Sequence, residues 1–179
     1  MNSPGSDIVI RRATVADAPT IAQHRAAMFH EMDELEAHRI DNLVDRATRY
    51  LLGALESGEY IGWLAAAGDR PGAIIGGAGV QLRRTLPHPR EPDTAPHGMQ
   101  AIVLNVYTVP AWRHRGVAEQ LMAQVIAWAG EAGMHTLVLH ASTAGRPLYE
   151  KLGFAATNEM RYGRPLRRPA NNMEGRDRD

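Results

Sequence analysis

The chain has 179 residues, of which 44% are hydrophobic and 22% are charged, and it contains no cysteine. This length and composition predict a single globular domain with a sizeable core. The absence of cysteine excludes disulfides, cysteine-ligated zinc and a cysteine acyl-enzyme. Twenty basic and twenty acidic residues give a formal net charge of zero, which argues against a general nucleic-acid binder.

The two ends of the chain predict where the protein resides and how far its domain extends. No apolar run approaches 18 residues, so we expect no membrane span. The first residues, MNSPGSD, lack the apolar core of a signal peptide, so we expect cytoplasmic residence. We expect one domain over residues 7–162, with flexible tails at 1–6 and 163–179 because the last segment is rich in Arg, Pro, Asn and Asp.

The first third of the chain predicts a strand followed by two helices. Residues 7–12 read as a strand, and Thr14 and Asp17 have the spacing of a capping box. A helix should follow to about residue 29, because apolar residues recur at helical spacing. Residues 30–38 are acidic without regular spacing, which indicates either a solvated helix end or the rim of a site for a cation. Residues 41–56 have one apolar face and predict the second helix.

The next segment predicts a pair of strands. Residues 60–67 and 73–82 are apolar and flank a turn-like segment at 68–72. Three glycines in the second strand, Gly76, Gly77 and Gly79, indicate a bulge or a close approach to another backbone. Residues 83–99 contain four prolines and show no apolar period, so we expect an irregular connection there.

The stretch after this connection predicts an anion-binding site. Residues 102–109 read as a strand that ends at Pro110, and a helix follows with apolar positions Val117, Leu121, Val125 and Trp128. Between them lies the basic turn 113–116, which ends in Gly116. The first N–H groups of a helix have no intrahelical partner and lie at the positive end of its dipole, so they bind phosphates. An ordinary solvated helix start is the alternative at this point.

The last part of the chain predicts three short elements. Residues 136–140 should form a short buried strand, and residues 146–152 a short helix with Pro147 in its first turn. Residues 154–160 should form a last strand. The eight histidines of the chain are scattered, and no pair has ligand spacing with a carboxylate, so we expect no metal site.

Two motifs resemble those of the GCN5-related N-acetyltransferase (GNAT) family. Arg113, Gly116 and Ala118 match its Q/R-x-x-G-x-G/A motif, which follows Val109-Pro110, and residues 148–154 read LYEKLGF. The resemblance implies an α/β fold in which a mixed, mostly antiparallel sheet is flanked by helices. It also implies that the sheet is splayed between its fourth and fifth strands, with a bulge in the fourth.

The same resemblance implies where acetyl-CoA binds. The pyrophosphate is expected on the backbone N–H groups of six consecutive residues, His114, Arg115, Gly116, Val117, Ala118 and Glu119, with added charge from Arg113 and Arg115. The pantetheine arm is expected to pair with Tyr107, Thr108 and Val109 like an extra strand. Many family members carry an asparagine seven residues before a conserved tyrosine, where this chain has Ser142, followed by Thr143. Either hydroxyl is a candidate partner for the arm.

Catalytic roles are expected for Tyr149 and His140. Tyr149 matches the tyrosine that protonates the leaving thiolate in the family, and a phenol suits an alkyl thiol because their pKa values are similar. Many members use a glutamate base on the fourth or fifth strand, but this chain has no glutamate within residues 100–109 or 135–140. The base candidates are therefore His140, Tyr107, His97 and the acidic segment near Glu31 and Glu34.

The resemblance predicts an acetyl-CoA-dependent N-acetyltransferase that acts by direct transfer on the primary amine of a small molecule or peptide. A non-catalytic acetyl-CoA-binding regulatory module and an acyltransferase for another acyl-CoA are the alternatives. We expect no metal, nucleic-acid or membrane partner, and the resemblance makes a homodimer a candidate assembly. Residues 83–99 look like an insertion, and the hypothesis is that they cover the acceptor cleft.

Overall fold

The computed structural model describes residues 8–68, 70–87, 89, 91 and 98–160. The predicted tails and His97 lie outside these residues. Five strands form one sheet in the order β1-β2-β3-β4-β5. The strands are β1 (Ile8–Arg12), β2 (Tyr60–Ala67), β3 (Arg70–Arg84), β4 (Met99–Thr108) and β5 (Leu137–Leu139). The pairs β1–β2, β2–β3 and β3–β4 are antiparallel, and β5 is parallel to β4, so the predicted mixed sheet is confirmed.

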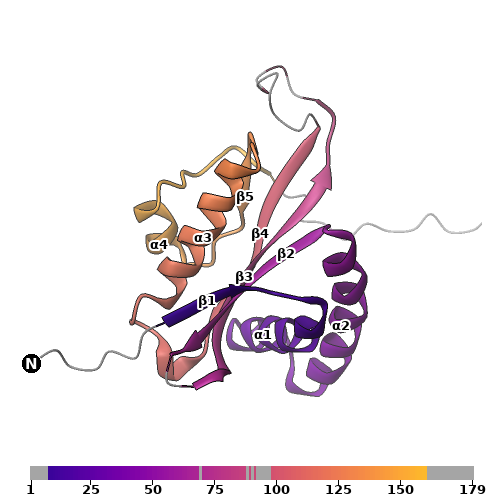
Figure 1. The fold of residues 1–179 in the computed structure, drawn as a ribbon, viewed down its shortest axis with the longest axis vertical. Helices are drawn as coiled ribbons and strands as arrows, with labels where there is room; N and C mark the ends of the chain where they lie inside the picture. Colours follow the sequence, from indigo (N-terminus) through magenta and orange to yellow (C-terminus); the bar gives the residue numbers. More distant parts are fainter. Residues whose placement is uncertain (1–7, 69, 88, 90, 92–97, 161–179) are drawn as a thin grey trace, which may run out of the picture.

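Helices cover both faces of this sheet (Figure 1). Helices α1 (Ala18–Glu31) and α2 (Ile40–Ser57) lie on one side, and α3 (Val117–Glu131) and α4 (Arg146–Lys151) lie on the other. Three short 3₁₀ turns lie between these elements. η1 (Val15–Asp17) precedes α1, η2 (Ala37–Arg39) precedes α2, and η3 (Pro110–Trp112) precedes the loop before α3. The two-sided covering explains why β2 is buried along almost its whole length.

Each face of the sheet has its own hydrophobic core. The α3 face is built from residues of β2, β3, β4 and α3, which include Trp63, Ala65, Val80, Val103, Val117, Leu121, Met122 and Val125. The opposite face packs α1 and α2 through Ala18, Ile21, Ala22, Leu51, Ala54, Tyr60 and Leu64. The apolar faces predicted for the three long helices therefore point into these cores.

The glycines of β3 lie where β2 and β4 approach closely, as predicted. A Cβ at Gly76 would lie 2.8 Å from the Tyr107 carbonyl oxygen, and one at Gly79 would lie 1.9 Å from the Tyr60 hydroxyl. β3 is longer than predicted, because pairing on both edges extends it from Arg70 to Arg84. The turn predicted over 68–72 is correspondingly shorter.

Two predictions near the C-terminal end are wrong. Residues 154–160 form no strand, since Ala, Asn and Glu dominate this segment and are disfavoured in strands. β5 has only three residues and is half-buried rather than buried. Among the described residues no strand pairs with its outer edge, so that edge stays open.

Candidate active site

β4 and β5 separate after a short region of pairing. Their register runs only from Ala101 opposite Leu137 to Val103 opposite Leu139, whereas β4 continues to Thr108. Asn105 adopts the left-handed conformation with φ 56°, and three steps along β4 from Leu104 to Tyr107 oppose two steps along β3. One extra residue in one strand is a β-bulge, which bends the strand. The predicted splay and bulge are therefore both present.

The separated part of β4 leaves backbone groups open to a ligand. The Val109 N–H donates to the Ile75 carbonyl at 2.9 Å, on the β3 side. Since alternate residues of a strand direct their N–H groups to opposite edges, Thr108 directs its N–H toward the open edge. The Thr108 hydroxyl oxygen is buried without a hydrogen-bond partner among the described residues. Of the predicted set Tyr107–Val109, Thr108 is thus the residue whose N–H faces the open edge.

The loop between η3 and α3 has the backbone shape of an anion site. His114 and Gly116 both have positive φ, 59° and 79°, and Gly116 is the N-cap of α3. The first helical hydrogen bond runs from the Gln120 N–H to the Gly116 carbonyl at 3.0 Å. The N–H groups of Val117, Ala118 and Glu119 precede it and lack intrahelical partners. A Cβ on Gly116 would meet its nearest atom only at 3.9 Å, so the space above the loop is open.

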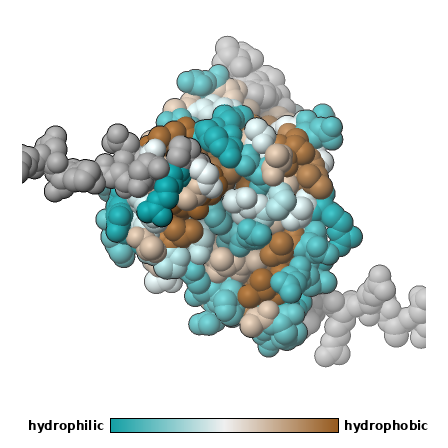
Figure 2. Space-filling model, turned by 60° about the horizontal axis from the view of Figure 1, so that its bottom comes forward, coloured by the Kyte–Doolittle hydropathy of each residue, from teal (hydrophilic) through white to brown (hydrophobic). Residues whose placement is uncertain are grey.

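The two arginines of this loop fold back onto the protein. Arg113 donates through Nε to the Thr108 carbonyl at 3.0 Å and through Nη2 to the Glu31 carboxylate. Arg115 places its guanidinium 5.0 Å from the ring of Trp112. Figure 2 views the molecule from the side at the bottom of Figure 1, where β4 ends and α3 begins, and shows hydrophobic patches separated by hydrophilic side chains.

Tyr149 lies half-buried on α4 against the α3-side core. Its ring makes an edge contact with Phe154 at 6.0 Å between centroids, and burial raises the pKa of its hydroxyl. A Cβ at Gly145 would lie 2.9 Å from this ring, so glycine is needed there. Tyr149 therefore remains a protonated phenol at neutral pH, as a general acid requires.

Ser142 and Glu119 have structural partners close to Tyr149. The Ser142 hydroxyl accepts the Gly145 N–H at 3.1 Å and closes the turn before α4. Lys151, at the end of α4, donates to both carboxylate oxygens of Glu119 at 2.8 and 2.9 Å. This ion pair ties the first turn of α3, at the loop, to the helix that carries Tyr149.

The base candidates differ in their surroundings. His140 has a 63% exposed side chain, and its Nε2 lies 3.9 Å from a Glu159 carboxylate oxygen. Tyr107 donates its hydroxyl to Glu31 at 2.9 Å, and burial raises its pKa, with the Glu31 contact adding to the effect. Glu31 accepts from both Tyr107 and Arg113, whereas Glu34 is exposed.

Sequence reasoning missed a polar cluster under the bulge. Asn105 accepts from Arg25 at 2.7 Å and donates to the Tyr60 hydroxyl at 3.0 Å. Burial raises the pKa of Tyr60 to about 12. A polar Asn within an aliphatic strand was the available signal, because buried amides need hydrogen-bond partners.

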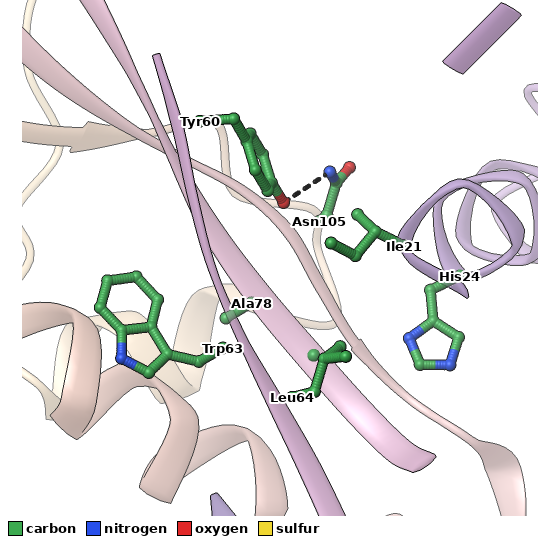
Figure 3. A pocket seen from close by; sticks show the side chains of 8 residues that line it. Ile21, His24, Tyr60, Trp63, Leu64, Ala78 and Asn105 are labelled. Atoms are coloured by element: carbon green, nitrogen blue, oxygen red, sulfur yellow. Dashed lines mark hydrogen bonds between the residues drawn. The ribbon is translucent and has the colours of Figure 1, made fainter. Parts of the chain in front are cut away.

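His24 from α1 was also missed, and no sequence signal marked it. It lines a cavity of about 10 Å³ with Tyr60 and Asn105 (Figure 3). Its ring is 5.1 Å from that of Tyr107, its Nδ1 is buried without a partner among the described residues, and burial lowers its pKa. His24 therefore adds a neutral imidazole to the face of β4 that α1 covers.

The described residues contain no arrangement typical of a metal site or of a membrane span. No group of three or more His, Cys, Asp or Glu side chains in this part of the chain is arranged to hold a metal ion. No helix within the described ranges is both long and apolar enough to cross a membrane.

Known proteins share this geometry. The family described as "Acetyltransferase (GNAT) family" matches residues 17–154. A curated relative, aminoglycoside N(6')-acetyltransferase type 1 of Stenotrophomonas maltophilia, is 29% identical over 158 residues, which cover 87% of this chain and 91% of the relative.

Two crystal structures are similar over most of the chain. A GCN5-related N-acetyltransferase from Ralstonia eutropha JMP134 has a TM-score of 0.77 and 32% identity, covering 89% of this chain and 99% of its own. A predicted acetyltransferase from Clostridium acetobutylicum, solved with acetyl-CoA, has a TM-score of 0.74 and 25% identity, covering 87% and 95%. These matches agree with the mixed sheet, the open edge of β4 and the loop before α3. This chain belongs to the GNAT family of acetyltransferases.

Proposed function

We propose that the protein transfers the acetyl group of acetyl-CoA directly to a primary amine of a small molecule or peptide. The observation that carries the proposal is that the open edge of β4 leads, through η3 and residues 113–116, to the N-terminus of α3. The edge offers backbone groups to an extended arm, and the helix start offers unpaired N–H groups to a pyrophosphate. One end of the donor is thereby held beside the strand and the other at the loop.

The proposed reaction needs no covalent enzyme intermediate. The neutral amine attacks the thioester carbonyl carbon, a C–N bond forms, and the C–S bond breaks. The departing thiolate takes the phenol proton of Tyr149, and the amine proton leaves to a base or to water. The chain has no cysteine, which supports direct transfer between two bound substrates.

A small polyamine is the acceptor class that we propose first. The relative from Stenotrophomonas maltophilia is named for aminoglycosides, which suggests a compact acceptor with several amines. The acidic residues of the segment after α1, Asp33, Glu34 and Glu36, would suit such a cation.

A melting scan followed by an acetylation assay tests this proposal. Acetyl-CoA or CoA at about 100 times its dissociation constant adds roughly 2.7 kcal/mol of stability. We expect the melting temperature to rise by about 5–10 °C with either ligand. We then expect acetyl-CoA-dependent release of free thiol with an aminoglycoside, and little with propionyl-CoA or succinyl-CoA.

Two outcomes would contradict the proposal. An unchanged melting temperature with both ligands would show that the loop before α3 binds no donor. A rise with CoA but no thiol release, for either an aminoglycoside or peptides with a free N-terminus, would favour a binding module without transfer activity.

A further inference from the structure

Three side chains from three separate parts of the chain meet beside residues 113–116, the donor loop. Glu31 is the last residue of α1, Tyr107 lies near the end of β4, and Arg113 follows η3. The Tyr107 hydroxyl donates to Glu31 Oε1 at 2.9 Å, and Arg113 Nη2 donates to Glu31 Oε2. Both carboxylate oxygens of Glu31 therefore accept hydrogen bonds, one from β4 and one from the first residue of the donor loop.

Arg113 joins this contact to the backbone of β4. Its Nε donates to the Thr108 carbonyl at 3.0 Å, and its guanidinium carbon lies 5.8 Å from the centre of the Tyr107 ring. Tyr107 is only 8% exposed and gives the guanidinium a fixed support. A planar guanidinium with partners in two directions has little freedom to rotate. Arg113 is thus held between α1 and the end of β4.

The loop that begins at Arg113 needs such support. His114 is a non-glycine residue with positive φ, which costs energy and persists only when the surroundings impose it. Gly116 also has positive φ. Among the described residues, Glu31 is the only side chain that forms an ion pair with residues 113–116. The side chains of Glu31 and Arg113 are 36% and 40% exposed, so the pair remains partly screened by solvent.

We infer that Glu31 is a positioning residue that sets the donor-binding loop through Arg113 and so links helix α1 to the cofactor site. The inference rests on the proposed function, because it takes this loop as the place where the CoA pyrophosphate binds. Helix α1 packs on the face of the sheet opposite α3. Glu31 therefore transmits the position of α1 to the start of α3.

A double-mutant cycle with Glu31→Gln and Arg113→Gln tests this link. The dissociation constant of free CoA is measured by calorimetry, and kcat and KM for acetyl-CoA are measured in parallel. We expect each single variant to weaken CoA binding about three- to tenfold, because the loss of a charged hydrogen bond leaves the loop less firmly positioned. We expect kcat to stay within about twofold of wild type. We expect the double variant to bind no more weakly than the weaker single variant, because both changes break one contact.

Two further variants show whether a loss of CoA affinity depends on the Arg113 pair. Glu56→Gln removes an exposed carboxylate from the last turn of α2 and should bind CoA as wild type does. Tyr107→Phe removes the hydroxyl but leaves the Arg113 pair, so it should weaken CoA binding less than Glu31→Gln. Melting temperatures without ligand near the wild-type value would show that each variant is folded.

Several results would overturn the inference. One is a Glu31→Gln variant that binds CoA as tightly as Glu56→Gln does, and another is a double variant in which the two single losses multiply. A loss of kcat at unchanged CoA affinity would instead assign Glu31 to the chemical step. A wild-type protein that binds CoA but acetylates no amine would contradict the proposed function alone, and the CoA dissociation constants would still decide this inference.

Discussion

Two tyrosines at the site use their phenol protons differently. Tyr107 donates its hydroxyl to Glu31, so its proton is already engaged. The hydroxyl of Tyr149 has no such bond to a side chain in the described part of the chain, and burial raises its pKa above the ordinary value. A free phenol that stays protonated is available to a thiolate. Tyr149 is therefore the better candidate for the general acid.

Replacing Tyr149 with Phe should abolish most turnover. We expect kcat to fall by roughly 10²–10⁴-fold, the usual contribution of a general acid. KM for acetyl-CoA should stay near the wild-type value, because the ring and its contact with Phe154 are kept. Steady-state kinetics measure both quantities. Tyr50→Phe, which removes an exposed phenol on α2, is the matched control and should leave kcat unchanged.

The pH profile gives this prediction a second readout. A general acid acts only while protonated, and the raised pKa of Tyr149 extends that range upward. In the wild type, any loss of kcat due to Tyr149 should therefore appear only above about pH 10. A Tyr149→Phe variant with wild-type kcat would show that the residue serves packing alone.

At the scale of elements, the start of α1 is held by a charged contact. Asp17 accepts from Arg11 at 2.7 and 2.8 Å and from the Thr14 N–H at 2.7 Å. These hydrogen bonds, with that of Arg11 as the largest, hold the pKa of Asp17 well below its usual range. The predicted capping box is thus confirmed, and Arg11 adds a connection from β1 to η1.

Asp17→Asn should destabilise the protein in a pH-dependent manner. The lowered folded-state pKa means that ionised Asp17 contributes stability above about pH 3.9, and this contribution is lost as pH falls further. At pH 7 we expect a loss of about 1 kcal/mol, the usual contribution of a cap, or about 2–4 °C in melting temperature. Arg11 is 48% exposed, which limits the gain from the charge itself.

Melting scans from pH 7 down to pH 3 measure this difference. The gap between wild type and Asp17→Asn should narrow below about pH 4, because the carboxyl of the unfolded chain is protonated there while that of the folded protein stays ionised. Asp45→Asn, which changes an exposed carboxylate within α2, should show no comparable gap. A gap of equal size at every pH would mean that the charge of Asp17 contributes nothing.

At the scale of the whole molecule, the two ends of β4 lead to different parts of the fold. The ten residues of β4 span about 33 Å. The Thr108 end leads to the donor loop, and the Met99 end leads to the β3–β4 connection at the far end of the sheet (Figure 1). This connection starts as a paired hairpin, with the Thr85 N–H donating to the Gly98 carbonyl at 2.8 Å. Residues 88, 90 and 92–97 lie outside the described residues.

Replacing residues 86–97 with an Asn-Gly turn tests the two ends of β4 separately. We expect the rise in melting temperature with CoA to be kept, because the donor loop lies at the opposite end of the strand. The hypothesis that this insertion covers the acceptor cleft predicts a changed acceptor KM at constant KM for acetyl-CoA. Acceptor kinetics identical to wild type would contradict it.

Much of the fold follows from local patterns in the sequence. Helical periodicity located α1, α2 and α3, and the Arg113–Ala118 motif located the loop before α3, because both depend on residues a few positions apart. Only the last predicted strand, at residues 154–160, failed entirely. Its weak β-formers needed a partner that three-residue β5 does not provide.

What the sequence alone determined is the type of each main element, the family and the residues of the two motifs. The tertiary structure decided which side chains meet: Arg113 pairs with Glu31 across 82 positions, and Asn105 bonds Arg25 across 80. Such contacts depend on how α1 packs against the sheet, which no short-range spacing encodes. The extent of the splay is likewise set by where β4 bulges and where β5 ends.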